Sequence, residues 1–320
     1  MTLYVFPPFF DLPSLDPVSL QFLAVSRFVA SDIRVVPLAN PSHSPTGRLP
    51  CYVDEDVRIS DFDEFVDYLR GAHREIVLDY ELTQEQRSLC VAYSSLIREK
   101  LVPALEHLLW VDEYNYGSLT RCMYTNTMNF PHYLFFLNAR RNAAIRLVEE
   151  LEKTPKDLLK DATNVLNLLS AKLDENKYVH GNKPSSLDAL LFGFLAPLLK
   201  LPLANDRLQL QLGSLPNLCI FLENIASIYL PLSEEQLRKS VEHRKEFTAQ
   251  VDRARKTLEK QRNNEKIKKA EKQKAERDSG QNLILFGLVS ISLSIAFAIH
   301  TGLVKRNVTV NTRLRKKKPK

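Results

Sequence analysis

Short apolar runs in the first 60 residues predict four β-strands. Residues 3–6 are apolar and are followed at once by two prolines, and residues 33–38 are rich in β-branched side chains. Two more short runs, at 51–53 and 57–59, follow a loop with many Pro, Ser and Asn residues. Runs of this length, bounded by turn-forming residues, are typical of strands.

Helical periodicity separates and follows these strands. From residue 17 to about residue 29, apolar side chains recur at helical spacing, and Ser14 or Asp16 is available as the cap. Ser60 and Asp63 predict a capping box at the start of a second helix, which continues through Leu69. The order βαβ followed by ββα predicts a small α/β domain over residues 1–72.

Beyond residue 80 the pattern predicts helices alone. Thr83 and Gln86 form the signature of a capping box, and the helix that they begin can continue to about Asp112 with a bend at Pro103. We therefore expect an all-helical domain over residues 73–232. Its further helices are predicted at 131–151, 155–174, 185–199 and 216–229.

The next segment, residues 233–282, has the composition of a solvent-exposed helix. Ser233 and Gln236 predict a capping box, and helix-forming residues continue without a glycine until Gly280. The apolar positions form only a thin, broken stripe, at Leu237, Val241, Phe247, Val251 and Leu258. Such a stripe favours a charged helical stalk over a packed domain element, with a coiled coil as the alternative.

An apolar segment follows, at residues 283–304, and it contains no charged side chain. At about 1.5 Å per residue, a helix of this length extends roughly 33 Å, which matches the hydrocarbon core of a bilayer. We expect a transmembrane helix here and a basic tail at 305–320. The predicted anchor residues are Leu283, Phe286, Val289, Ile291, Ile295, Phe297 and Val304.

The place of this predicted anchor also indicates where the preceding domains lie. An anchor so near the last residue emerges from the ribosome only when translation ends, so the bulk of the chain is expected to face the cytosol. A modest apolar span with basic residues on both sides favours the mitochondrial outer membrane over the endoplasmic reticulum. The first residues have no basic region and no long apolar run, so a signal peptide is not expected.

The net charge of +6 describes the last quarter of the chain more than its body. Residues 251–280 and 305–320 hold 19 Lys and Arg against six acidic residues, so the remainder carries a net charge near −7. A basic face on a folded domain, which nucleic acid recognition requires, is therefore not predicted. The cysteines lack the spacing of zinc or redox motifs and the histidines show no H-E-x-x-H, so we predict reduced thiols and no metal site.

The segment VHGNKPSSLDALLFGFLAPLLKL, residues 179–201, contains the strongest internal motif. Ser185 and Asp188 predict a capping box in which each side chain accepts a hydrogen bond from the backbone N–H of the other. The helix that follows is apolar on all sides, which places it in the centre of its domain. A carboxylate there is either catalytic or structural, and the capping pattern favours the structural role.

Two other groups leave alternatives open. His107 and Trp110 lie on one helical face, which fits a functional pair or, more simply, packing between domains. The aromatic run Tyr133, Phe135 and Phe136 fits a partner-binding patch or a buried helix face. Packing is the favoured interpretation of both groups.

This succession of elements resembles the glutathione transferase fold. That fold joins a thioredoxin-like βαβββα domain to a helical domain with a G-x-x-x-[ST]-x-x-D motif, which matches Gly181, Ser185 and Asp188. Pro50 stands directly before the third strand, where the fold carries a cis-proline, so the resemblance implies a cis Leu49–Pro50 bond. The predicted class is α+β, with a thioredoxin-like domain, an all-α domain, a charged helical stalk and one C-terminal transmembrane helix.

Several longer stretches resemble the metaxin family, which has this fold. The resemblance is weakest in the charged segment at 234–280. The apolar tail also has the place expected of the tail-anchored metaxin type. The stretches are NPSHSPTGRLP (40–50), HLLWVDEYNYGSLTRCMY (107–124), FPHYLFFLNAR (130–140), HGNKPSSLDALLFGFLA (180–196), KLPLANDRLQLQLGSLPNLC (200–219) and IASIYLP (225–231).

The resemblance implies a non-enzymatic subunit of the mitochondrial outer membrane without a cofactor. Its implied partners are a second metaxin and the β-barrel sorting and assembly machinery, with a role in the import or insertion of outer-membrane proteins. Metaxins are also linked to contact-site complexes and to adaptors that join mitochondria to motors, which is the alternative role. The mechanism would be binding, on a transferase-like scaffold.

The residues themselves argue against transferase chemistry. Transferases of this fold use a Tyr, Ser or Cys just after the first strand, but here Tyr4 lies within the strand and Ser14 comes several residues late. They also hold glutathione with an acid–Ser pair, which falls on Asp61 and Phe62 when the chains are aligned at residues 68–69. We therefore predict no catalytic and no cofactor-binding residue. The alternative is a tail-anchored transferase-like enzyme or sensor of the ganglioside-induced differentiation-associated kind.

Overall fold

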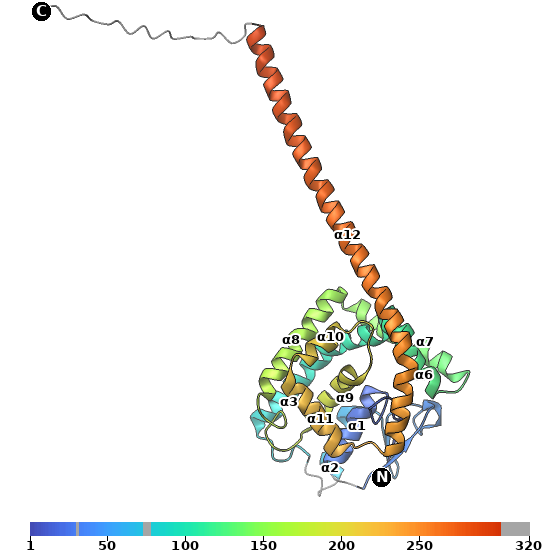
Figure 1. Cartoon of the computed structure of the whole chain (residues 1–320). Coiled ribbons are helices and arrows are strands. Elements are labelled where there is room, and N and C mark those ends of the chain that lie inside the picture. Colours follow the sequence, from blue (N-terminus) through green and yellow to red (C-terminus); the bar gives the residue numbers. More distant parts are fainter. Residues whose placement is uncertain (30–31, 73–77, 302–320) are drawn as a thin grey trace, which may run out of the picture. The chain divides into compact units, whose positions relative to one another are not determined.

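The computed structural model describes residues 1–29, 32–72 and 78–301. The chain divides into two compact units, Met1–Leu258 and Glu259–Lys320. The first unit contains the sheet and all the helices that surround it, and the second contains the remainder of the last helix (Figure 1). The candidate site lies entirely within the first unit.

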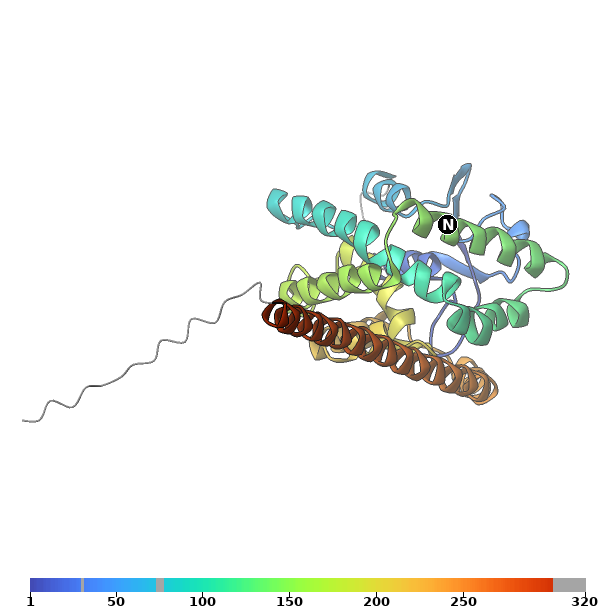
Figure 2. The same ribbon diagram turned by 90° about the horizontal axis from the view of Figure 1, so that it is seen from above.

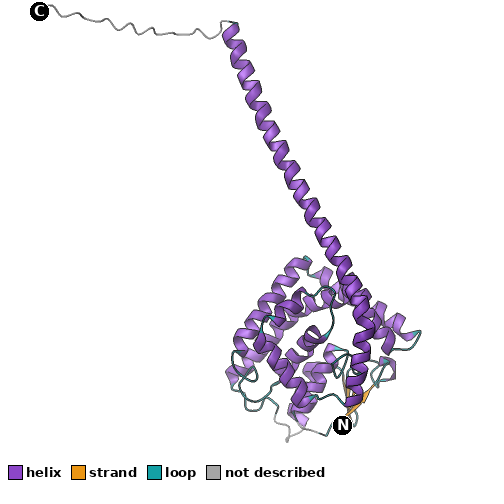
Figure 3. Ribbon diagram, in the orientation of Figure 1, coloured by secondary structure: helices purple, strands orange, loops and turns teal. Residues whose placement is uncertain are grey.

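Four strands form a mixed sheet within the described part of the first unit (Figure 3). Their order is β2-β1-β3-β4, with β1 parallel to β2 and antiparallel to β3, and β3 antiparallel to β4. Helix α1 (Pro17–Phe28) connects β1 to β2, and α2 (Phe62–Ala72) follows β4. This confirms the predicted βαβ and ββα order. The strands are β1 (Thr2–Val5), β2 (Arg34–Pro37), β3 (Cys51–Asp54) and β4 (Val57–Ile59).

The caps of the first two helices follow from short polar side chains. The Asp16 carboxylate accepts a hydrogen bond from the Ser19 N–H at 2.8 Å and so caps α1, as one of the two predicted choices. The capping box predicted for Ser60 and Asp63 is wrong. Asp61 caps α2 instead, because its carboxylate accepts from two backbone N–H groups in the first turn, at 2.9 and 3.0 Å.

The helical part of the first unit begins with the predicted capping box of Thr83 and Gln86, which is present. The helix expected between 83 and 112 is formed by α3, α4 and two π-helical segments. The sequence predicted no helix for α5, α6 and α10, which have only three to seven residues. The bounds are α3 (Gln84–Leu96), η2 (Ile97–Leu101), α4 (Val102–Glu106), η3 (His107–Val111), α5 (Glu113–Asn115), η4 (Tyr116–Thr120), α6 (Arg121–Thr127), α7 (His132–Glu150), α8 (Pro155–Leu173), α9 (Ser186–Lys200), α10 (Arg207–Gly213) and α11 (Pro216–Tyr229); a 3-10 turn, η1, spans Pro41–His43.

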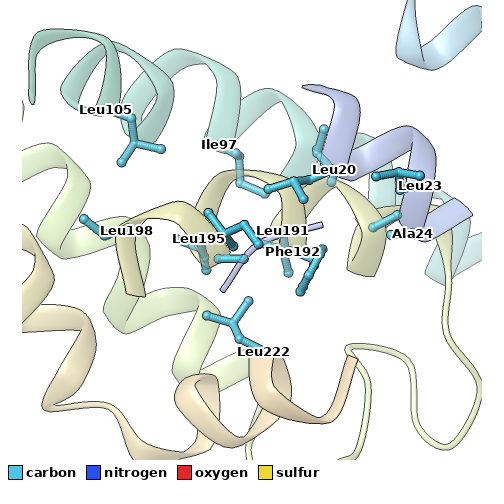
Figure 4. Close-up of a cluster of buried hydrophobic side chains, with 14 of the residues drawn as sticks. Leu20, Leu23, Ala24, Ile97, Leu105, Leu191, Phe192, Leu195, Leu198 and Leu222 are labelled. Atoms are coloured by element: carbon cyan, nitrogen blue, oxygen red, sulfur yellow. The ribbon is translucent and has the colours of Figure 1, made fainter. Parts of the chain in front are cut away.

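Helix α9 is the centre of the core, as its apolar sequence predicts. It lies among α1, α3, α10 and α11 (Figures 1 and 2), and its buried leucines interdigitate with those of α1 and α11 (Figure 4). The closest approach to α1 is at Gly193, where an added Cβ would lie 2.2 Å from the Gln21 Cγ and 2.6 Å from the Pro17 carbonyl oxygen. Glycine is therefore required for α1 and α9 to pack this closely.

Helix α12 (Glu234–His300) begins where the charged segment was expected to begin. Its residues through Leu258 belong to the first unit, and Phe247, Val251 and Leu258 are buried there. The expectation of a stalk, rather than a packed element, is therefore wrong for residues 234–258. The thin apolar stripe is enough to pack because it meets apolar residues of the first unit.

Within the second unit, the predicted anchor residues Phe286, Val289, Ile291, Ile295 and Phe297 are exposed on α12. No helix in the described ranges is both long and apolar enough to cross a membrane. The transmembrane helix expected at 283–304 is therefore not confirmed. The Leu283 side chain and Val304 lie outside the described residues.

Candidate functional site

The loop after β1, residues 6–15, is where a transferase of this fold carries its reactive side chain. In this chain Tyr4 lies in β1, paired with Cys51 of β3. Ser14 is fully buried, and its hydroxyl accepts a hydrogen bond from the Asp16 N–H at 3.4 Å, at the entry of α1. Ser14 is the one residue of the loop with a hydroxyl, and it is buried at the entry of α1, while Tyr4 precedes the loop.

The first part of α12 packs directly on this loop. The His243 ring stacks on Phe9 with centroids 4.2 Å apart, and the Phe247 ring meets Phe9 and Phe10 edge-on at 5.7 Å. Both phenylalanines of the loop are almost fully buried, with exposed fractions of 3% and 1%. Helix α12 therefore packs on the loop through His243 and Phe247, whereas Leu237 and Val241 of the predicted stripe are exposed.

A polar clasp holds α12 on the same loop. Ser240 and Arg244 both donate hydrogen bonds to the Asp11 carboxylate. Burial by itself would raise the pKa of Asp11, but these two hydrogen bonds and the Arg244 charge outweigh it and lower the pKa below its usual value. Sequence analysis missed this clasp, because the partners are more than 220 residues apart and belong to no motif.

An aromatic cluster fills the space on the other side of the loop. Phe6 contacts Tyr124 and Phe136 with centroids 5.8 Å apart in each case, and Trp110 lies 5.3 Å from Tyr124. The Arg140 guanidinium lies 4.9 Å from the centre of the Trp110 ring and pairs with Glu106. Trp110 is therefore a packing residue, as the favoured interpretation of that group expects.

His107, the other member of the predicted functional pair, has different surroundings. It lines a separate small cavity of about 100 Å³, together with residues of α8 and α10. Burial lowers the pKa of His107 below its ordinary value, so the ring is neutral at physiological pH. The two side chains have separate environments, and neither has the surroundings of a catalytic group.

The structure describes both positions expected from the transferase fold, the acid–Ser pair that holds glutathione and the cis-proline. Asp61 caps α2 through its Oδ1, which accepts two backbone hydrogen bonds, and the adjacent Phe62 ring packs 6.1 Å from Phe22. The Leu49–Pro50 bond is cis and Pro50 is buried directly before β3. The cis-proline expected of the fold is thus present, whereas a packed phenylalanine stands at the position of the transferase serine.

Ser185 and Asp188 form the capping box at the start of α9. The Asp188 carboxylate is fully buried and accepts hydrogen bonds from the N–H groups of Val179 and Ser185, at 2.9 and 2.7 Å. Burial raises the pKa of Asp188 to about 6, although the hydrogen bonds oppose the shift. Because every partner is structural, this carboxylate orders the α9 turn.

A cysteine–histidine pair that has no sequence motif lies beside this turn. The Cys90 Sγ is 3.1 Å from the His180 Nε2, although the residues are 90 positions apart. Burial raises the pKa of Cys90 to about 12, so the thiol stays protonated and is a poor nucleophile. Among the residues that the structure describes, no group of three or more His, Cys, Asp or Glu side chains is placed to hold a metal ion.

Comparison with known proteins gives the family of this scaffold. Residues 19–141 match the model of a family described as outer mitochondrial membrane transport complex protein, and residues 162–225 match the glutathione S-transferase C-terminal domain. The chain is 42% identical to the metaxin-1 homolog of Caenorhabditis briggsae, over 96% of this chain and 98% of that protein. The chain belongs to the metaxin family.

More distant metaxins agree with this assignment, and a solved transferase shares the fold. Metaxin-1 of Mus musculus is 34% identical over 74% of this chain and 77% of its own length. Metaxin-3 of Xenopus laevis is 35% identical over 68% of this chain and 73% of its own length. Glutathione transferase GSTFuA3 from Phanerochaete chrysosporium superimposes with a TM-score of 0.51 at 15% identity, over 72% of this chain and 98% of that one, which shows the fold alone.

This metaxin exposes an apolar surface on α7 and the turn before it. Phe130 and Phe135 are 74% and 73% exposed, and Leu134 is 42% exposed. The adjacent Phe136 points into the aromatic cluster, so the aromatic run of the sequence is divided between a buried and an exposed face. Residues 126–139 contain no charged side chain. An exposed apolar surface of this kind is typical of a site that binds another molecule.

Proposed function

We propose that this metaxin is a non-enzymatic binding subunit that works in protein import and β-barrel assembly at the mitochondrial outer membrane. The observation that carries the proposal is the closed transferase-like site. Helix α12 covers the loop after β1, aromatic side chains fill its other side, and the residues that should activate a thiol and hold glutathione are replaced. A scaffold in which the transferase positions carry no suitable reactive side chain is expected to act by binding.

The partners that the family resemblance implies are a second metaxin and the β-barrel sorting and assembly machinery. We infer that the exposed surface of Phe130, Leu134 and Phe135 contributes to one of these contacts, because its aromatic side chains are the type enriched in protein interfaces. We also infer that the body faces the cytosol. Its four cysteines are free, which suits a reducing compartment.

A site-specific crosslinking experiment in isolated mitochondria tests the partners. A photoreactive amino acid replaces Phe135, and the control replaces Leu168 of α8, which is 51% exposed on a different surface. We expect position 135 to capture a second metaxin or an assembly-machinery subunit, and position 168 to capture neither. Capture of motor adaptors alone would support the organelle-transport role instead. If position 135 captured nothing beyond the control, the proposed contact would be wrong.

Two further measurements test the absence of chemistry and the orientation. The full chain should show no saturable glutathione binding at micromolar concentration and no thiol transfer above the uncatalysed rate. Saturable micromolar binding would support the transferase-like enzyme or sensor. Protease added to intact mitochondria should digest residues 1–258, and protection of this region until the outer membrane is opened would contradict the cytosolic orientation.

A further inference from the structure

A cavity of about 550 Å³ in the first unit adjoins the loop after β1. It is bounded by the end of β1 and that loop, the second half of α1, strand β2, and the segment 228–236 from the end of α11 to the first turn of α12. Sites for small molecules typically have volumes of roughly 300–1,000 Å³. The cavity is therefore large enough for a ligand, and none of the sequence motifs refers to it.

Most of the residues that line the cavity have apolar side chains. Val5, Phe6 and Leu23 form its floor, with exposed fractions of 2%, 2% and 4%. Ile228, at the rim, is 52% exposed, so an apolar side chain stands in solvent at the entrance. Prolines and leucines make up most of the remaining lining. Such a lining favours an alkyl chain, because the burial of each methylene is favourable.

The polar groups of the lining are few, and one of them is unpaired. The Tyr229 hydroxyl accepts a hydrogen bond from Tyr178, and the Gln236 side chain accepts one from the Ser233 N–H. Arg27 is the one charged residue of the lining, and no acidic residue lines the cavity. The Arg27 side chain is exposed near the end of α1. It makes no ion pair or hydrogen bond with any residue that the structure describes.

We propose that this cavity binds a single-chain amphiphile with one anionic head group, a carboxylate or a phosphate monoester. The alkyl chain lies on the floor of Val5, Phe6 and Leu23, and the head group pairs with the Arg27 guanidinium, whose N–H groups suit bidentate binding of either anion. A cationic or zwitterionic ligand fits less well, because no lining carboxylate would pair with its positive charge. Glutathione, with its amino group and little apolar surface, is disfavoured for the same reason.

The site is tested with the purified full chain and a photoactivatable fatty acid. Labelled peptides, identified by mass spectrometry, should come from the segments that line the cavity, residues 5–13, 17–37 and 228–236. Arg27→Gln should weaken fatty acid binding about tenfold, the size expected for a hydrogen-bonded charge pair of about 1.4 kcal/mol. The matched control is Arg34→Gln, since Arg34 is exposed on β2, loses the same charge and does not line the cavity.

Three probes separate the possible ligands. The fatty alcohol of the same chain length should bind more weakly than the acid, and Arg27→Gln should not change its affinity further. A lysophosphatidic acid of equal chain length tells whether a phosphate or a carboxylate is the better head group. Inorganic phosphate alone should not displace either amphiphile, since it lacks the apolar chain.

Three results would overturn the proposal. They are the absence of saturable binding to the unsubstituted chain, equal affinity of the Arg27→Gln and Arg34→Gln variants for the fatty acid, and labelling that maps outside the three cavity segments. The melting temperatures of both variants should equal that of the unsubstituted chain, because both side chains are exposed. A loss of binding by Arg27→Gln therefore does not arise from unfolding.

Discussion

Replacement of Phe247 by alanine should release the first part of α12 from the loop that it covers. Phe247 is 1% exposed and contacts the rings of Phe9 and Phe10, which also contact each other. If α12 closes the transferase-like site as described, the loss of this one ring should expose the loop while leaving the central core around α9 intact.

The magnitude follows from the burial and the two aromatic contacts. Full burial of a phenylalanine side chain contributes about 1.5–3 kcal/mol. Each edge-to-face pair, here with centroids 5.7 Å apart, contributes about 0.5–1.5 kcal/mol more. Together these agree with the roughly 3–5 kcal/mol measured for Phe→Ala in protein cores. The population with α12 detached should rise by about two to four powers of ten.

Amide hydrogen exchange of the full chain is the appropriate assay. Peptides from 6–15 and 234–258 should lose protection in Phe247→Ala, whereas peptides from α9 should keep it, since local opening and global unfolding are separate events. Alkylation of Cys122 provides a second reading, because its Sγ lies 3.4 Å from the Gln250 side chain of α12. Detachment should accelerate that reaction.

The control is Val241→Ala, on the same helix but 53% exposed, which should change the opening free energy by less than about 0.5 kcal/mol. The reasoning is refuted if Phe247→Ala changes the protection of 234–258 by less than 1 kcal/mol. It is equally refuted if both variants behave alike. In either case α12 would not be held by the buried ring.

Three other substitutions test the interior of the first unit. Asn115→Ala should lower the melting temperature by roughly 6–20 °C, because the buried amide serves two backbone N–H groups and two carbonyl oxygens, and Asn142→Ala on the surface should have no effect. Gly193→Ala should cost at least about 1–3 kcal/mol in thermal unfolding, since its Cβ has no space against α1, while Gly213→Ala, which has open space, should be neutral. Asp188→Asn should remove a pH dependence. The pKa of this carboxyl is raised to about 6 by burial, so the folded chain binds more protons than the unfolded chain between about pH 4 and 6, and its stability falls as the pH rises through that window. The difference in the free energy of unfolding between the unsubstituted chain and the variant should change by about 3 kcal/mol from pH 4 to 7. A difference that stays constant over this range would contradict the raised pKa.

The elements that depend on neighbouring residues were predictable from the sequence. The strands and the long helices follow from runs of apolar residues, and the boxes at Thr83 and Ser185 follow from side chains three residues apart. Even here a shift by one residue was possible, since Ser60 and Asp61 both suit a cap and the helix uses Asp61. Strands, helices and caps could be predicted because their hydrogen bonds depend on residues that are close in the sequence.

The state of the site depended on contacts between distant parts of the chain. The stripe that includes Phe247 looks too thin to pack until Phe9 and Phe10 are placed against it, and the Asp11 clasp joins residues of the first loop and the last helix. The opposite directions of Phe135 and Phe136 likewise depend on what surrounds α7.

The sequence by itself determined the fold and the family of this metaxin, because periodicity, caps and motifs are properties of short segments. Only the tertiary structure decided that its transferase-like site is closed and that an apolar cavity with an unpaired Arg27 lies beside the sheet. Burial and pairing are properties of the space between segments. A one-dimensional pattern shows which residues can be buried, and the fold decides which partners bury them.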